Sequence, residues 1–133
     1  MKKPKRKSLI TKLDNLVSQI VRIRDGQKCV ICGSTEKLGN SHLFSRKNFS
    51  LRWDIRPSGN CHTNCWSCNF KHSSRDSYPY FNWYITKFGK SRFDNLHKEW
   101  QGVTIVKQFQ LELLRDNLEL ILKEMQLVIQ LNK

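Results

Sequence analysis

Apolar residues recur at helical spacing in a stretch near the N-terminus, residues 8–24. The apolar positions lie three or four residues apart, which is the spacing of one helix face: Leu9, Leu13, Leu16, Val17, Ile20 and Ile23. Ser8 is the expected N-cap, and Asp25-Gly26 is expected to end the helix in a turn. The pattern therefore predicts one amphipathic helix over residues 8–24.

A second helical pattern covers residues 104–131, which contain neither Gly nor Pro. One apolar stripe alternates intervals of three and four residues, as the seam of a coiled coil does: Leu111, Leu114, Leu118, Ile121, Met125 and Val128. Leu113, Leu120 and Leu127 form another stripe. We expect one of two arrangements. Either both stripes form one wide buried face, or one stripe packs on the domain and the other contacts a partner, such as a second copy.

The region between these helices is different. Residues 29–78 show no helical period at first, and they hold all five cysteines and three of the four histidines. A short helix is expected to start near Cys65. Pro79 and Gly89 suit the first position and the end of another helix, and residues 93–100 predict one more. The aromatic residues here either form core or stack on bases, and we expect core: Phe81, Trp83, Tyr84, Phe88 and Phe93.

These patterns predict an α+β fold that is mostly helical, with three segments. Residues 1–7 form a basic tail that we expect to be disordered, residues 8–102 form one domain, and residues 103–133 form a long helix for packing or dimerisation.

Charge and apolar content limit the kinds of partner that the protein can be expected to bind. Lys and Arg outnumber Asp and Glu by 24 to 11, which gives a formal net charge of +13. Nucleic acid is the expected polyanion, with solubility or anionic lipid as the weaker explanations. No stretch of 18 apolar residues and no signal peptide is evident, so we expect a cytoplasmic protein with no membrane span.

Two Cys-x-x-Cys pairs, Cys29/Cys32 and Cys65/Cys68, carry the clearest chemistry. Each pair places two thiolates on one tight turn, and two pairs satisfy one tetrahedral Zn²⁺. A thiol redox site would need only one pair, so a structural zinc is the better prediction. Four thiolates close the ion to substrate, so any catalysis must use other residues. Cys61 is left over and is expected to be a small buried residue.

Three motifs follow one another along the chain: CVICGS at residues 29–34, SHLFSR at residues 41–46 and LRWDIRPSGNCHTNCWSCN at residues 51–69. In this order they resemble the NinG/Rap family of phage recombination nucleases, a branch of the HNH or ββα-metal endonucleases, from about residue 16 to residue 100. The resemblance implies a β-hairpin and a helix stapled by zinc, flanked by the N-terminal and C-terminal helices. It also implies a phage or prophage origin, with action inside the bacterial host cell.

The resemblance also implies residue roles. His42, at the end of the first strand, would be the general base, since its ordinary pKa lies near neutrality. Asn69 would bind a catalytic Mg²⁺ or Mn²⁺, and Asn60 would fix the hairpin loop. Either His72 or His62 would complete the metal site. This sequence departs from the family pattern at Ser41, where many relatives carry an Asp ligand, in the insertion Pro57-Ser58-Gly59, and at Asn64 in place of Gln.

Basic residues near these motifs are the expected DNA contacts. Arg46 is a candidate phosphate clamp, and the others extend the track: Lys47, Arg52, Arg56, Lys71 and Arg75. The leading hypothesis is a metal-dependent DNA endonuclease acting on branched or single-stranded recombination intermediates. The alternatives are a non-catalytic, zinc-stabilised nucleic-acid-binding module and a protein-interaction adaptor built on the terminal helix.

Overall fold

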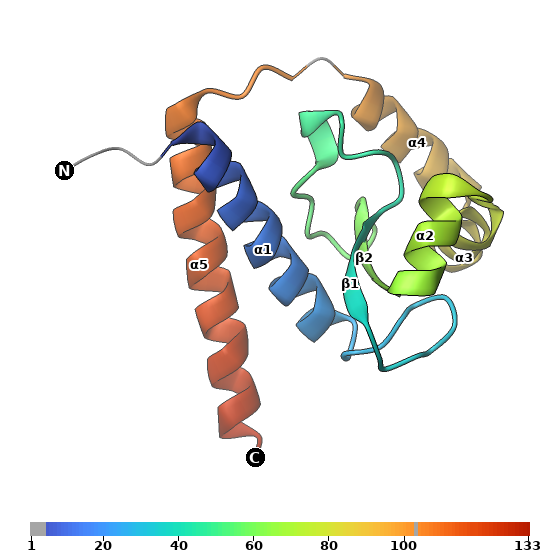
Figure 1. Ribbon diagram of the computed structural model, residues 1–133, viewed down its shortest axis with the longest axis horizontal. Coiled ribbons are helices and arrows are strands. Elements are labelled where there is room, and N and C mark those ends of the chain that lie inside the picture. Colours follow the sequence, from blue (N-terminus) through green and yellow to red (C-terminus); the bar gives the residue numbers. More distant parts are fainter. Residues whose placement is uncertain (1–4, 103) are drawn as a thin grey trace.

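The computed structural model describes residues 5–102 and 104–133, and within them it confirms a mostly helical α+β fold with one small sheet (Figure 1). The elements follow in this order: α1 (Arg6–Arg24), β1 (Leu38–His42), a 3₁₀ turn (Phe49–Leu51), β2 (Cys61–Cys65), α2 (Trp66–Ser74), α3 (Tyr78–Phe88), α4 (Lys90–Gln101) and α5 (Gln108–Leu131). No helix in the described part of the chain has both the length and the apolar character that a bilayer crossing requires.

The ends of the two outer helices differ from those expected. α1 begins at Arg6, with Lys5 rather than Ser8 as the N-cap, so residues 6–7 of the predicted tail are helical. Residues 1–4 of that tail, and residue 103, lie outside the described residues. α5 begins only at Gln108, where the side chain of Gln110 accepts a hydrogen bond from the backbone N–H of Lys107 at 2.8 Å. A side-chain contact thus marks the start of α5, whereas α1 begins at Arg6 without a side-chain cap.

α1 and α5 lie side by side and run in the same direction (Figure 1). The side chain of Arg6 donates to the carbonyl of Val106, and Lys12 pairs with Glu119 at 3.8 Å. Between the helices, and against the hairpin, lies a cluster that we call the aliphatic core: Leu9, Leu13, Leu16, Val17, Ile20, Val21, Trp53, Cys61, Leu111, Leu118 and Leu122. The apolar stripe of the first predicted helix is thus buried against the last.

The sheet is an antiparallel hairpin in which Leu38 faces Cys65 and His42 faces Cys61. Residues 43–60 join the two strands. Because side chains alternate across a strand, Cys61 enters the aliphatic core while His62 points the other way. The hairpin is therefore the layer that separates two cores.

The second cluster, which we call the aromatic core, lies on the other side of the hairpin with α2, α3 and α4 (Figure 1). Its buried members are Leu43, Phe44, Leu51, Tyr80, Tyr84 and Leu96. All five aromatic residues predicted as core belong to it or pack against it. That prediction is confirmed.

Candidate metal centre and adjoining cleft

Four cysteines converge between the end of α1 and the start of α2. Cys29 and Cys32 come from the loop after α1, Cys65 ends β2, and Cys68 lies in the first turn of α2. Their sulfur atoms all lie within 4.8 Å of one another, and those of Cys32 and Cys65 are 3.7 Å apart. A tetrahedron with Zn–S bonds of about 2.3 Å has edges of roughly 3.8 Å. The tetrad can therefore hold one structural Zn²⁺, as the sequence predicted.

Backbone hydrogen bonds shape the two turns that carry these thiols. The N–H of Gly33, whose φ is 79°, donates to the carbonyl of Cys29, and the N–H of Cys68 donates to the sulfur of Cys65 at 3.4 Å. The N–H of Val30 donates to the carbonyl of Thr63, which fastens the first turn to β2. Burial would raise the pKa of the Cys29 thiol, but nearby backbone N–H groups bring it down to about 7. Burial and the neighbouring cysteines instead raise the pKa values of the Cys68 and Cys32 thiols, so a cation is needed to hold all four sulfurs as thiolates.

Cys61 takes no part in the tetrad. It is fully buried in the aliphatic core, and its thiol donates weakly to the carbonyl of Arg52 at 3.4 Å. Burial raises the pKa of this thiol to about 12, so it stays protonated and unreactive. The expectation of a small buried residue is confirmed.

His42 is the last residue of β1, and one of its ring nitrogens has a fixed partner. Nε2 lies 2.9 Å from the carbonyl oxygen of Arg52. Because a carbonyl can only accept, Nε2 carries the proton and Nδ1 keeps its lone pair. Burial lowers the pKa of His42 below its usual 6.5, with smaller opposing effects from the Arg52 carbonyl and Asp14. The imidazole is therefore neutral at pH 7, with Nδ1 able to accept a proton.

Asn60 clamps the loop that follows His42. Its side-chain oxygen accepts from the N–H of Phe44 at 2.8 Å, and its amide group donates to the carbonyls of Phe44 and Leu51. Its own carbonyl accepts from the N–H of Leu43, the residue after His42. Asn60 is completely buried, so these bonds are shielded from water. The side chain thus holds both ends of the segment that begins at His42.

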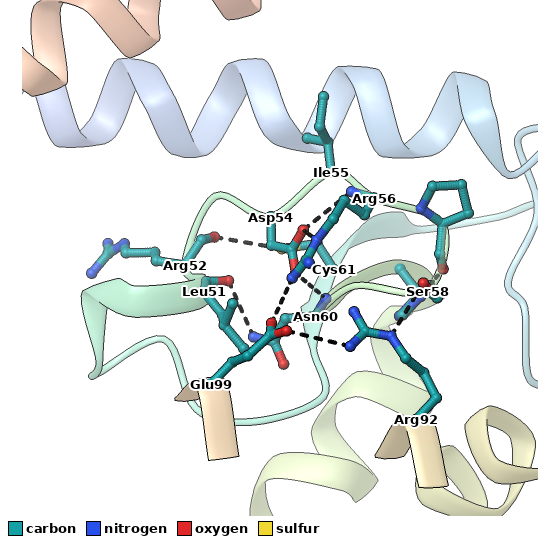
Figure 2. A network of polar contacts seen from close by, with 12 residues as sticks. Leu51, Arg52, Asp54, Ile55, Arg56, Ser58, Asn60, Cys61, Arg92 and Glu99 are labelled. Carbon is teal, nitrogen blue, oxygen red and sulfur yellow. Dashed lines mark hydrogen bonds and ion pairs between the residues drawn. The ribbon is translucent and has the colours of Figure 1, made fainter. Parts of the chain in front are cut away.

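Asp54 organises the rest of the same loop (Figure 2). Its carboxylate accepts from the N–H of Asn60 at 3.0 Å and from the guanidinium of Arg56 at 2.8 Å. Arg56 also pairs with Glu99 of α4, which in turn meets Arg92 at 3.4 Å. The network ties the loop to α4 from the side opposite α1.

Gly59 is required by this arrangement. A Cβ at this position would lie within about 2.5 Å of the Asp54 carboxylate. The glycine of the Pro57-Ser58-Gly59 segment therefore lets Asp54 approach the backbone of Asn60.

His42 opens onto a cleft of about 750 Å³ that runs along the edge of β1 toward α2. Asn69 and His72 line it from one turn of α2, and Arg46 and Lys47 line its rim. The structure thus brings His42, Asn69 and His72 to one site. Asn69 accepts a hydrogen bond of 2.7 Å from the hydroxyl of Ser41, so Ser41 orients the amide rather than acting as an acidic ligand.

A family model described as NinG, Bacteriophage Lambda NinG protein, matches residues 1–126. The chain belongs to the NinG family. Searches of curated proteins and of solved structures returned no match. The match covers α1 and most of α5. The first part of α1 and all of α5 lie outside the region of the sequence resemblance, so the family match extends to the outer helices as well.

Asn40 and His72, which both line the cleft of this NinG-family protein, each have one buried side-chain atom without a partner among the described residues: Oδ1 of Asn40 and Nδ1 of His72. The other ring nitrogen of His72 lies 2.9 Å from the carbonyl of Leu43 and donates to it. Burial lowers the pKa of His72, so its Nδ1 also offers a lone pair. Sequence reasoning missed Asn40, although it lies two residues before His42 and thus on the same face of β1.

His62 lies elsewhere, so the structure does not bring it to the cleft with His42, Asn69 and His72. Both ring nitrogens are engaged, Nδ1 with the hydroxyl of Tyr80 at 2.7 Å and Nε2 with the carbonyl of Pro57 at 2.9 Å. Burial lowers the pKa of His62 to about 4. Strand alternation, which turns His62 into the aromatic core, could have excluded it.

The cleft offers neutral ligands only. No Asp or Glu lines it, and within the described residues the cysteine tetrad is the one cluster of three or more His, Cys, Asp or Glu side chains placed to share an ion. Mg²⁺ and Mn²⁺ favour sites with at least one carboxylate or phosphate oxygen. The residues present therefore do not fit a divalent cation unless a phosphate supplies the anionic oxygen.

The predicted DNA contacts divide into two groups. Arg52 donates twice to the carboxylate of Asp14, at 2.7 and 3.0 Å, and Arg56 is held by Asp54 and Glu99. Both arginines are thus engaged by carboxylates of the fold, Arg52 largely buried and Arg56 about half exposed. Exposed basic side chains complete the predicted track: Arg46 and Lys47 at the cleft, Lys71 on α2 and Arg75 directly after it. Arg46 also lies 3.8 Å from the Asp14 carboxylate.

Proposed function

We propose that this NinG-family protein is an HNH-type DNA endonuclease in which His42 is the general base. The observation that carries the proposal is the state of its imidazole. A backbone carbonyl holds the proton on Nε2, burial keeps the ring neutral, and Nδ1 stays available beside a cleft with a basic rim. A neutral imidazole beside bound phosphate has the proton affinity that activating a water requires.

The reaction is hydrolysis of a phosphodiester bond. Nδ1 of His42 removes a proton from a water molecule as its oxygen attacks phosphorus. The bond from phosphorus to the 3′-oxygen breaks, and this oxygen takes a proton from solvent, leaving a 3′-hydroxyl and a 5′-phosphate. Arg46 and Lys47 bind the flanking phosphates. Asn60 and the Asp54 network keep the loop, and so the carbonyl of Arg52, in place behind the imidazole.

A divalent cation would stabilise the charge on the phosphate and the leaving oxygen. Asn40, Asn69 and His72 are the side chains that would face it, together with a phosphate oxygen. Because these ligands are uncharged, we expect the free protein to bind Mg²⁺ or Mn²⁺ too weakly for calorimetry to detect, even though cleavage requires the cation. A tight site in the DNA-free protein would contradict this expectation.

The substrate we propose is a branched or single-stranded recombination intermediate. Two considerations support it: the net charge of +13, and the motif resemblance to recombination nucleases, with membership of the NinG family. A panel of linear, forked and four-way DNA, each with and without Mg²⁺ or Mn²⁺, tests the preference directly.

Two substitutions of His42 test the base. His42→Gln places an amide N–H where Nε2 donates to Arg52 but removes the Nδ1 lone pair, whereas His42→Ala removes both. We expect both variants to lose cleavage by a factor of roughly 10²–10⁴ while binding DNA within about twofold of wild type. The cleavage rate should rise with pH through an apparent pKa below 6.5 and level off above pH 7. If His42→Gln cleaves normally, the assignment is wrong.

The alternative is a non-catalytic nucleic-acid-binding module, and its supporting observation is the cleft without a carboxylate. In that case the wild-type protein would bind every DNA of the panel and cut none of them with either cation, and His42→Gln would bind equally well. This outcome would overturn the enzyme proposal.

We further propose that α5 pairs with its copy in a second molecule. The stripe Leu113, Leu120 and Leu127 is more than half exposed. Extended by Phe109 and Leu131, which are also exposed, it has intervals of four, seven, seven and four residues, the same in both directions. Two antiparallel copies can therefore match residue for residue about a two-fold axis at Leu120.

Sedimentation velocity of wild type and Leu120→Glu tests this pairing. We expect a dimer that the substitution converts to a folded monomer. Removing α5 altogether is a poorer test, because α5 covers the apolar face of α1. A wild-type protein that is monomeric at about 100 μM would exclude the pairing and leave the stripe for another partner.

A further inference from the structure

α2 presents two aromatic side chains to solvent on a face that the proposed mechanism does not use. Trp66 is 66% exposed and Phe70 is 45% exposed. Their rings stack, with centroids 5.5 Å apart and planes inclined by only 12°. Two stacked rings on a surface bury part of each other but leave the outer face of the pair open.

The backbone that carries the pair is anchored. Trp66 is the first residue of α2, next to Cys65 of the tetrad, and its backbone N–H donates to the carbonyl of Lys37 at 2.9 Å. Phe70 follows one helical turn later, so the same turn positions both rings. A preorganised ring pair loses little conformational entropy when a flat ligand stacks on it.

Positive charge surrounds the pair. The guanidinium of Arg75 lies 5.9 Å from the ring centroid of Phe70, and Lys71 is exposed on the same helix. Asp76 is the acidic side chain nearest along the chain, and its carboxylate accepts from the N–H of Tyr78. Flat aromatic faces next to free cations complement a ligand with π-faces and phosphates, which describes a nucleic-acid strand with unpaired bases.

The pair also adjoins the cleft. Ser73 lines the cleft with Asn69 and His72, and its hydroxyl donates to the carbonyl of Phe70 at 3.3 Å. One turn of α2 therefore separates the cleft from the exposed rings. A strand whose phosphate lies beside His42 can place a nearby base against them.

We propose that Trp66 and Phe70 form a stacking platform for an unpaired base of the DNA strand held in the cleft, with Lys71 and Arg75 binding its phosphates. The proposal rests on the proposed function for the identity of the strand. Bases within a duplex are stacked on one another and hide their faces, so the platform selects DNA in which a base is free. Trp66 and Phe70 are thus positioning residues for the substrate.

The test measures binding without divalent cations, so that cleavage plays no part. Fluorescence anisotropy compares a single-stranded oligonucleotide with a duplex of the same length. We expect Trp66→Ala and Phe70→Ala each to weaken single-strand binding about tenfold and duplex binding less than twofold. Trp66→Phe should restore most of the affinity. Tyr78→Ala is the matched control, because Tyr78 is an aromatic residue of α3 that is also 66% exposed, and it should change neither affinity.

Abasic oligonucleotides sharpen the result. For the wild-type protein, removing the bases should weaken binding about as much as the Trp66→Ala substitution does. For the Trp66→Ala variant, removing the bases should weaken binding little further, because the stacking contact is already lost. The proposal would be overturned if Trp66→Ala and Phe70→Ala weakened single-strand and duplex binding equally. It would also be overturned if neither substitution weakened binding, and the exposed rings would then be a candidate protein contact. If the platform binds as expected but the protein cuts no DNA, the platform stands and the proposed function fails.

Discussion

The two cores on either side of the hairpin are built on different principles. The aliphatic core joins α1 to α5 almost entirely through Leu, Val and Ile side chains. The aromatic core carries polar groups inward: the hydroxyl of Tyr80 meets His62, and that of Tyr84 donates to the carbonyl of Ser58. Apolar packing is non-directional, whereas these hydrogen bonds fix a loop in one geometry. The difference explains why the candidate site borders the aromatic side.

Removing zinc should produce the largest difference in stability between the two sides of the hairpin. The tetrad joins the loop after α1 to the hairpin and α2, and structural zinc contributes on the order of 10 kcal/mol to small domains. After chelation we expect the amides of β1, β2 and α2 to lose protection from hydrogen exchange well before those of α1. Equal protection in a metal-free sample would show that the aromatic core suffices without the ion.

Leu118→Ala tests the aliphatic core. Leu118 is buried against α1, so truncation should cost about 3 kcal/mol of unfolding free energy in urea denaturation. Leu120, two residues later on the same helix, is exposed, and Leu120→Ala should cost less than about 0.5 kcal/mol in the monomer. Similar losses for the two variants would mean that both faces of α5 are buried in solution.

Acidification should destabilise the aromatic core and the segments that pack against it. His62 is neutral in the folded state, with its pKa lowered from 6.5 to about 4, and the pKa values of His42 and His72 are lowered as well. The unfolded chain binds protons below pH 6.5 and the folded chain does not, so stability is complete above pH 6.5 and falls as the pH drops toward 4. The loss attributable to His62 is about 3 kcal/mol. Thermal unfolding at successive pH values measures it, and His62→Gln should flatten the slope.

The ion pair between Lys12 and Glu119 should matter least. Both side chains are about half exposed and 3.8 Å apart, and such pairs contribute well under 1 kcal/mol. We expect Lys12→Met to change the urea midpoint by less than the error of the measurement, at low and at high salt. A large, salt-dependent loss would mean that charge as well as apolar burial joins α1 to α5.

Sequence reasoning succeeded where contacts are local or where spacing encodes them. Periodicity predicted the apolar stripes of α1 and α5, and motif spacing predicted the cysteine pairs. The family resemblance implied that His42 ends a strand. It failed at Arg52, which is engaged by Asp14, 38 residues away in the chain. The sequence does not distinguish an exposed arginine from one that forms a buried ion pair, because only the fold brings the partner carboxylate near.

The sequence by itself determined the helices, the thiolate tetrad and the residues that could do chemistry, since these depend on spacing and on the intrinsic properties of side chains. The tertiary structure alone decided which histidines line the cleft, which arginines are engaged by carboxylates, and which side-chain atoms of Asn40 and His72 are buried without a partner in the described part of the chain. These outcomes depend on the packing of the hairpin between two cores, where one step along a strand sends Cys61 to one core and His62 to the other.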